Sequence, residues 1–418
     1  MSATELVRAR RATAATFALV GAISAVWVVR IPALRDKLDL SEAQVGIEVL
    51  AWGAGALAAM HFAARLMAAH GSHRVLRYSV PAAVASLSLL AFAPNFPSLA
   101  AGGLVFGALF GLVDVAANAQ AAELERASGR PLMGKMHAGW SLGAVLGGLL
   151  GAGTAAAGLG FTASVALAAV LALPVALFTV PHFRAQDPAD AEREESAAAG
   201  GPLPRVIYLL GALMFCAFLA EGSVADWSSL HLHDSLGVSE AVAALGYPVF
   251  ELAMLAGRLF CDRVTERVGG RVLLAGAGLL AALGFAVLTA TEWVGAAFVG
   301  LALVGAAVCV VVPLTFSLAG LAGGTRSAAA ISRAGMFGYS GLLLGPVAIG
   351  FIAEHWSLRI SFSVVVCTCL LITVGAVRLP DLRVSHRPQD TDKPEPRAPG
   401  TASPTNQGST PCQGLSRK

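Results

Sequence analysis

Long apolar blocks and short polar breaks alternate along this chain: stretches of roughly twenty apolar residues recur about twelve times. A helix needs about twenty apolar residues to cross the hydrocarbon core of a bilayer, and a backbone in lipid must satisfy its own hydrogen bonds. The pattern therefore predicts an all-α membrane protein with twelve transmembrane helices. The spans are expected at 13–29, 45–67, 75–93, 97–121, 134–157, 160–180, 206–230, 241–261, 271–290, 293–318, 331–353 and 360–378.

Composition agrees with this fold class and narrows the function. Apolar residues make up 56% of the chain and charged residues 13%, against about 25% charged in a typical soluble domain. The net charge of +3 is too small to indicate a nucleic-acid partner. Gly129 to Lys135 resembles a phosphate-binding loop, but Met136 stands where the required Ser or Thr would bind magnesium. We find no catalytic or metal-ligand motif, so we expect no enzyme activity, no cofactor and no resident metal.

The longest interior break divides the spans into six and six. We expect an N-terminal six-helix half at 1–180, a cytoplasmic linker at 181–205 and a C-terminal six-helix half at 206–380. The remainder, 381–418, is rich in Pro, Ser, Thr and charge and is expected to be a disordered cytoplasmic tail.

Short sequence matches relate the two halves. Ala25-Val26-Trp27 recurs as Ala225-Asp226-Trp227, and Gly139-Trp140-Ser141 recurs as Gly338-Tyr339-Ser340, both at an offset near 200 residues. Equal offsets at equal depth in the spans indicate two parallel copies of one six-helix unit. In transporters of this plan the binding site lies near the midplane, between the halves.

The basic residues predict the orientation, because cytoplasmic loops carry an excess of Lys and Arg. Alternate breaks, starting with the second, hold fifteen: Arg65, Arg74, Arg77, Arg126, Arg130, Lys135, Arg184, Arg193, Arg205, Arg258, Arg263, Arg267, Arg271, Arg326 and Arg333. The other breaks hold only Arg30, Arg35, Lys37 and Arg359. Both termini are therefore expected in the cytoplasm, with the chain in the inner membrane.

Three segments carry a resemblance to a known family: Gly111 to Gln120, Met136 to Gly143, and Glu221 to Trp227. With the twelve-span plan, they resemble the major facilitator superfamily over about residues 12–380. More narrowly, they resemble its fucose-permease-like branch, including bacterial inner-membrane members with a histidine in helix 5.

The resemblance also implies a conformational latch after helices 2 and 8. The second half keeps its motif as Gly257, Arg258, Leu259, Asp262, Arg263 and Arg271. The first half departs from it, because Ala64, Ala68 and Ala69 stand where glycine, aspartate and arginine are expected.

Polar side chains inside the spans are the candidates for function, because an ionisable group at membrane depth usually marks a pathway or a partner. Asp114 and Asn118 are four residues apart and share a helix face. Desolvation favours the protonated form of a lone carboxylate, and the resemblance ties an acid at this position to proton and substrate handling. A structural aspartate bonded across helices is the alternative.

Further candidates for proton coupling or substrate binding are His137, Glu221 and Glu251. For each of them a structural role stays open: His137 at a helix start, and the two glutamates in pairs across helices. Glu48 is expected near the outer surface in a structural role, and Asp226 beside Trp227 at the membrane interface.

Four aromatic residues are candidates for stacking on a sugar-like ring: Trp27, Trp140, Trp227 and Tyr339. Helix packing or an interfacial belt is the alternative for each.

The sequence therefore predicts a secondary active transporter, a proton symporter that moves a small polar solute such as a sugar by alternating access. One alternative is a proton-driven exporter of hydrophobic or cationic compounds, and another is a non-transporting membrane sensor or scaffold. The expected partners are a small-molecule substrate, protons and the lipid bilayer, with a monomer as the default. Substrate identity, direction of transport and proton stoichiometry are not readable from the sequence.

Overall fold

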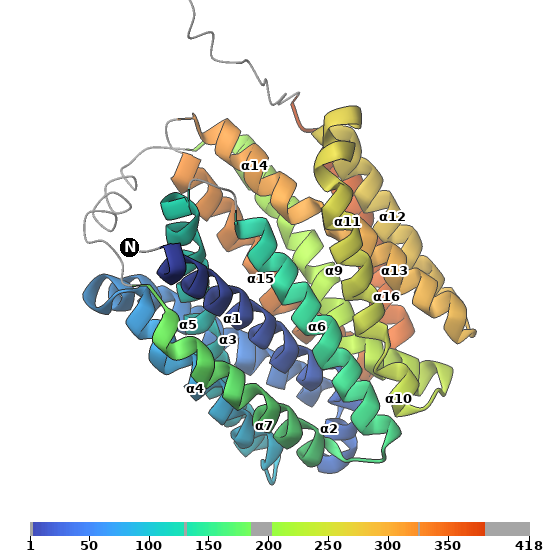
Figure 1. Cartoon of the computed structure of the whole chain (residues 1–418). Helices are drawn as coiled ribbons and strands as arrows, with labels where there is room; N and C mark the ends of the chain where they lie inside the picture. Colours follow the sequence, from blue (N-terminus) through green and yellow to red (C-terminus); the bar gives the residue numbers. More distant parts are fainter. Residues whose placement is uncertain (1–2, 129–131, 185–202, 325–326, 381–418) are drawn as a thin grey trace, which may run out of the picture. The chain divides into compact units, whose positions relative to one another are not determined.

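The computed structural model describes residues 3–128, 132–184, 203–324 and 327–380, which form long helices joined by short turns (Figure 1). The first half contains α1 (Ala3–Val29), α2 (Ile31–Leu38), α3 (Glu42–His70), α4 (Ser72–Ala91), α5 (Phe96–Ser128), α6 (Met133–Ala156), α7 (Phe161–Thr179) and the short η1 (Val180–His182). The second contains α9 (Arg205–Leu236), α10 (Glu240–Ala243), α11 (Gly246–Val268), α12 (Gly270–Ala290), α13 (Val294–Val308), α14 (Val311–Gly323), α15 (Ser327–His355) and α16 (Leu358–Val377).

The predicted twelve spans are confirmed, with changed boundaries. Within the described ranges, eleven helical segments are long and apolar enough to cross a membrane. The twelfth is the 20-residue α4, whose hydropathy is lowered by Arg74 and Arg77 near its start. One span is interrupted, because α13 ends at Val308 and α14 begins at Val311 with Pro313 in its first turn, where proline is tolerated.

Two short helices add to the predicted pattern. α2 forms in the break after the first span, and α10 forms at the start of the predicted span 241–261, which is divided between α10 and α11. Pro32 near the start of α2 and the hydroxyl of Ser239, which accepts from the backbone N–H of Val242, favour these helix starts. Most of the predicted linker (185–202) and the predicted tail (381–418) lie outside the described residues.

The helix contacts repeat between the halves, as the sequence matches predicted. In the first half α1 packs on α6, α3 on α5, and α4 on α7. The equivalent contacts in the second half are α9 on α15, α11 on α13, and α12 on α16. The fold therefore consists of two parallel six-helix units. Figure 1 shows α6 of the first unit and α15 of the second in the middle of the bundle.

Glycines allow these helix pairs to approach backbone to backbone. A Cβ added at Gly143 of α6 would lie 1.9 Å from the carbonyl oxygen of Ala18 on α1. A Cβ at Gly107 of α5 would lie 1.9 Å from the carbonyl oxygen of Trp52 on α3. Lipid supplies no hydrophobic force between helices, so this close van der Waals packing is what holds the units together.

We expect Gly143→Ala to lower the thermal midpoint of the purified protein, because the added methyl group overlaps the Ala18 carbonyl and must separate α1 from α6. Overpacking of this kind costs about 1–3 kcal/mol. Gly153→Ala on the same helix is the matched control, since its Cβ would meet no atom within 4 Å. Differential scanning fluorimetry in one detergent compares the two, and equal midpoints would contradict the close contact.

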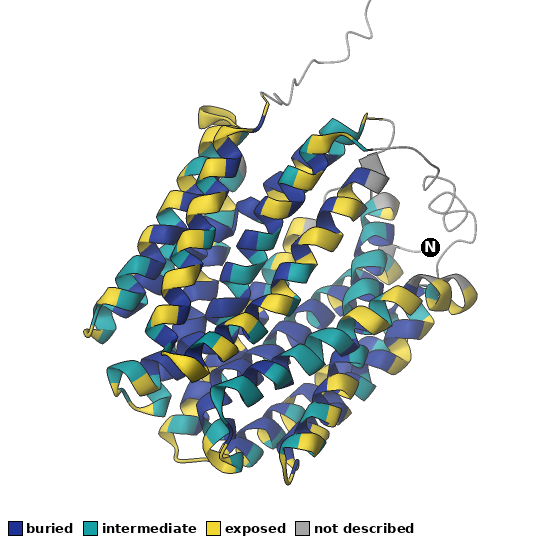
Figure 2. Cartoon of the chain, turned by 180° about the vertical axis from the view of Figure 1, so that it is seen from behind, coloured by how far each residue is buried: buried dark blue, intermediate teal, exposed yellow. Residues whose placement is uncertain are grey.

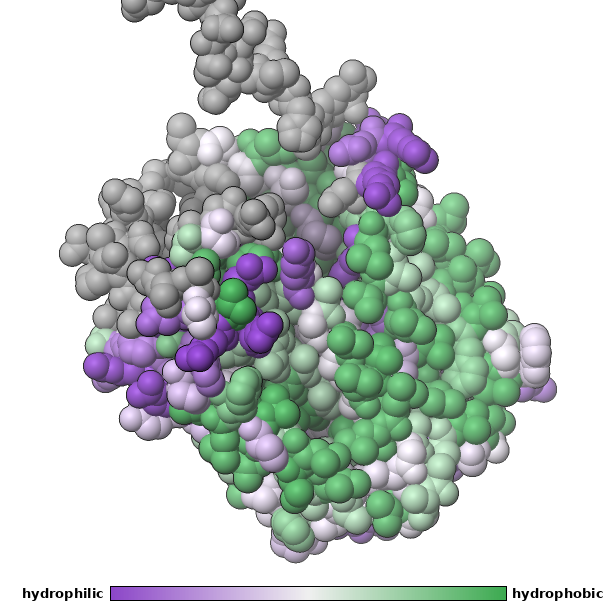
Figure 3. All heavy atoms as spheres, viewed as in Figure 1, coloured by the Kyte–Doolittle hydropathy of each residue, from purple (hydrophilic) through white to green (hydrophobic). Residues whose placement is uncertain are grey.

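The outward faces of the helices are apolar. Figure 2 shows buried residues where helices pack and exposed residues on the outward faces. The exposed set includes many large hydrophobic side chains, such as Leu171, Phe178 and Leu279. In Figure 3 hydrophobic side chains cover the sides of the bundle, while hydrophilic side chains gather near the α3–α4 and α11–α12 turns. This is the surface of a protein whose sides face lipid.

Candidate functional site

The two halves are joined by ion pairs at the end that carries α2 and α10, which we call the closed end. Arg30 is completely buried, and its Nη1 lies 3.1 Å from Oε1 of Glu240 in the other half. Arg35 pairs with Asp234 through both guanidinium Nη atoms, one of them at 2.9 Å. The sequence count treated Arg30 as an ordinary loop residue, although it directly follows an apolar span.

The two halves also pack directly against each other. The inter-half pairs in the described residues include α3 with α15, α6 with α11, and α1 with α9. Near the closed end, a Cβ at Gly148 of α6 would lie 2.3 Å from the Cγ of Pro248 on α11. The backbone N–H of Ala43 donates to Glu354 from α15 at 3.2 Å. The closed end is therefore sealed by direct contact.

Farther from the closed end, polar side chains of α9 and α11 meet α6 in what we call the central cluster: Ser141, Glu221, Tyr247, Glu251 and Arg258. Tyr247 donates its hydroxyl to Glu251 at 2.9 Å. Arg258 donates from Nη1 to the Ser141 hydroxyl at 3.1 Å, across the two halves. Glu221 and Glu251 both lie close enough to Arg258 for their charges to interact. One guanidinium thus faces two carboxylates between the halves.

Arg258 has a contact that the sequence did not predict. The resemblance places it in the latch motif at the end of α11, together with Asp262. In the structure Arg258 reaches Ser141 of the other half, so it lies within the bundle and not in a loop. The side chain of Asp262 lies outside the described residues.

The other latch residues have separate positions. Arg271 donates to the backbone carbonyl of Val377, which ties the start of α12 to the end of α16. Gly257 lets α11 approach α13, because a Cβ there would lie 2.5 Å from the sulfur of Cys309. Arg263 is exposed.

Asp114 lies near the middle of α5 and faces the second half. Asn118 donates from Nδ2 to the backbone oxygen of Asp114 at 2.9 Å and to its Oδ1 at 3.3 Å. Tyr339 of α15 lies close enough to interact with the charges of both Asp114 and Glu221. Asp114 is partly buried between the halves.

His137 and Trp140 border this region on α6. The His137 side chain is exposed and contacts Phe17 edge-on, with ring centroids 5.3 Å apart. It also lies within electrostatic range of Arg258. Trp140 is partly buried and packs edge-on against Phe110 of α5. Tyr339 stacks on Phe218 with centroids 5.1 Å apart and stays 37% exposed.

Two of the four predicted stacking residues are placed differently. Trp27 is 1% exposed and contacts Trp52 and Phe161, and Trp227 is 0% exposed. Neither presents a ring face to the space between the halves in this conformation. Asp226 and Trp227, which were expected at the membrane interface, are both buried inside the bundle.

Glu48 and Asp226 form a second acidic feature that the sequence did not predict. Glu48 on α3 is 1% exposed and Asp226 on α9 is 5% exposed. They lie close enough for their charges to repel each other across the two halves. Because residue spacing relates only groups on one helix, this pairing had no signal in the sequence.

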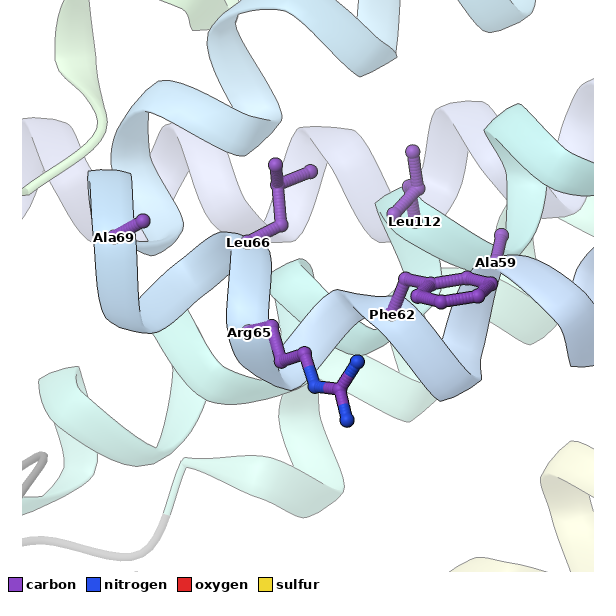
Figure 4. A pocket seen from close by; sticks show the side chains of 6 residues that line it. All are labelled: Ala59, Phe62, Arg65, Leu66, Ala69 and Leu112. Carbon is purple, nitrogen blue, oxygen red and sulfur yellow. The ribbon is translucent and has the colours of Figure 1, made fainter.

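The first-half latch region is an apolar hollow on α3 and α5 (Figure 4). Its lining includes Phe62, Leu66, Ala69 and Leu112, and Arg65 projects away from Leu66 in this view. Ala69 occupies the place where the family motif carries arginine. The side chains of Ala64 and Ala68 lie outside the described residues.

A family model described as Major Facilitator Superfamily matches residues 12–320 and, in a second match, 210–411. The chain belongs to the major facilitator superfamily. The resemblance noted in the sequence is thereby confirmed at the level of the superfamily, and the protein is a multi-pass membrane transporter.

Bacterial relatives support this membership. The chain is 34% identical over 367 residues to "Uncharacterized transporter y4wD" of Sinorhizobium fredii, covering 88% of this chain and 97% of the relative. It is 34% identical to an MFS-type transporter of Yersinia pestis, covering 87% and 93%. It is 30% identical to "Membrane protein MosC" of Rhizobium meliloti, covering 88% and 89%.

Solved transporters share the fold. The nucleoside transporter NupG superposes with a TM-score of 0.70 at 11% identity, covering 89% of this chain and 99% of that one. The xylose transporter XylE from E. coli, in a partially occluded inward open conformation, gives 0.68 at 13% identity, covering 88% and 98%. At these identities the likeness concerns the fold.

Proposed function

We propose that this major facilitator is a proton-coupled secondary transporter that moves a small polar solute across the inner membrane by alternating access. The observation that supports the proposal is the set of acidic groups between the halves. Glu221 and Glu251 lie within electrostatic range of Arg258, which bridges to Ser141 of the first half, while Asp114 of α5 lies within range of Tyr339. Buried charge is costly, so the excess of acid over base here favours proton binding.

The orientation is part of the proposal. Removing Arg258 from the loop count leaves fourteen basic residues against four, which still favours cytoplasmic termini. The closed end, which carries Arg30, Arg35 and Lys37, is then the outer end. The conformation described here is accordingly inward-facing.

The solute-binding residues we propose come from both halves. Asp114, Asn118, His137 and Trp140 would contact the solute from the first half, and Glu221 and Tyr339 from the second. Hydroxyl-rich solutes suit this set, since carboxylates, an amide and an imidazole accept or donate hydrogen bonds and the two aromatic rings offer apolar faces. Trp27 and Trp227 are not included because both are buried.

A thermal-shift screen of the purified protein against sugars, sugar acids, nucleosides and hydrophobic cations, at two pH values, tests the solute class. A polar solute that stabilises the protein, and whose uptake into proteoliposomes follows an inward proton gradient, is the expected result. Stabilisation by hydrophobic cations with proton-driven extrusion would favour the exporter. Absence of stabilisation and of flux across the whole panel would favour a sensor or scaffold.

A further inference from the structure

Between the central cluster and the closed end lies the buried acidic pair Glu48 and Asp226. Glu48 is in the second turn of α3, which starts near the closed end, and Asp226 is in the half of α9 that leads to that end. Each helix belongs to a different half, so the two carboxylates lie on opposite sides of the boundary that has to separate when this end opens.

No protein group in the described residues donates a hydrogen bond to either carboxylate oxygen of Glu48. The site makes room for this carboxylate, because a Cβ at Gly103 of α5 would lie 2.4 Å from its Oε1. Burying an unpaired ionised carboxylate in such a position is strongly unfavourable. A second carboxylate within electrostatic range makes it more so, because nearby like charges resist ionising together.

The charged groups around the pair do not neutralise it. Tyr247 of α11 lies within electrostatic range of Asp226, but its hydroxyl donates to Glu251. Arg30, at the end of α1, is engaged by Glu240 and by the Leu159 carbonyl. At the closed end Arg35 pairs with Asp234, and from α15 Glu354 accepts from Ala43. On α9, Glu221 lies about one and a half turns from Asp226 and within range of Arg258.

We propose that Glu48 and Asp226 form a second proton-binding site, occluded between the halves, and that the proton held there keeps the closed end shut. With one proton the pair carries a single charge, and the halves stay in contact at this end, where α3 packs on α15. When the proton leaves, two carboxylates repel each other in a dry interface, and opening this end to water relieves the repulsion. Proton binding to the pair and closure of this end are then linked, and each favours the other.

This inference deepens the proposed function, since the pair would be one of the transporter's proton sites, but its test needs no solute flux. Infrared pH-difference spectra of the reconstituted full-length protein report protonated carboxyl groups by their C=O stretch. We expect Glu48→Gln and Asp226→Asn each to remove a carboxylic-acid band seen in the unmodified protein. Glu266→Gln, at an exposed position of α11, is the matched control and should keep the band.

Hydrogen–deuterium exchange of the α2 and α10 peptides, corrected for intrinsic rates, reports opening of the closed end. Exchange should rise with pH in the unmodified protein and in Asp114→Asn, and should lose that rise in Glu48→Gln. A band that persists in both acid-pair variants, a pH response in Glu48→Gln like that of the unmodified protein, or closure that follows sodium rather than pH would overturn the proposal. Failure of transport alone would bear on the central cluster and leave the acid pair standing.

Discussion

Asp114→Asn should abolish uphill, pH-driven solute uptake while leaving the protein folded and able to exchange solute downhill. Asparagine keeps the size of the side chain and the contact with Asn118 but cannot bind and release a proton. Coupling therefore fails, whereas solute still crosses in counterflow, because exchange needs no net proton movement. Proteoliposomes with and without an inward proton gradient separate the two activities.

Asp39→Asn is the matched control for this variant. Asp39 is exposed at the end of α2 with a φ of 52°, a left-handed conformation that asparagine also adopts readily. It should transport like the unmodified protein. Concentrative uptake by Asp114→Asn at the unmodified rate would remove Asp114 from the coupling mechanism and leave only the architecture.

The helical architecture was predictable because each span is a local property. About twenty apolar residues in succession specify a helix in lipid whatever its neighbours are. The repeated matches around Trp27 and Trp227 likewise revealed the parallel halves. The helices run past the predicted spans, as α1 does from Ala3 rather than residue 13, because helices continue beyond the hydrocarbon core and hydropathy marks only the apolar part.

The site was only partly predictable, because spacing along one helix does not say which other helix it faces. Asp114 and Asn118 share a face by their four-residue spacing, and the structure joins them by hydrogen bonds. The latch motif gave Arg258 a role within its own half, whereas tertiary packing also directs it to Ser141 of the other half. Trp27 and Trp227 occupy equivalent positions of the sequence repeat, at the same depth in their spans. Equivalent position does not show whether a ring lines a cavity or packs between helices.

Arg258→Met should reduce transport about tenfold or more, because it removes the cation within electrostatic range of Glu221 and Glu251 and breaks the contact with Ser141. Losing a hydrogen bond to a charged group costs about 1.5–3 kcal/mol, and 1.4 kcal/mol corresponds to a factor of ten. Arg258 is partly exposed, which places the effect at the lower end of that range. Arg258→Lys keeps the charge but not the two-pronged donor geometry. Its transport rate should therefore lie between those of the unmodified protein and Arg258→Met.

Thermal stability shows why Arg258→Met loses transport. Arg258→Met alone should lower the thermal midpoint, because it leaves carboxylates uncompensated, and adding Glu221→Gln should restore part of it by removing one of them. A double-mutant cycle measures this coupling. Transport should stay lost in the double variant, since the bridge to Ser141 is still absent. Arg267→Met, exposed on the same helix, is the control. If the effects of Arg258→Met and Glu221→Gln on stability were simply additive, the charge of Arg258 would not stabilise the Glu221 carboxylate. The carboxylates would then have to be neutralised by protons alone.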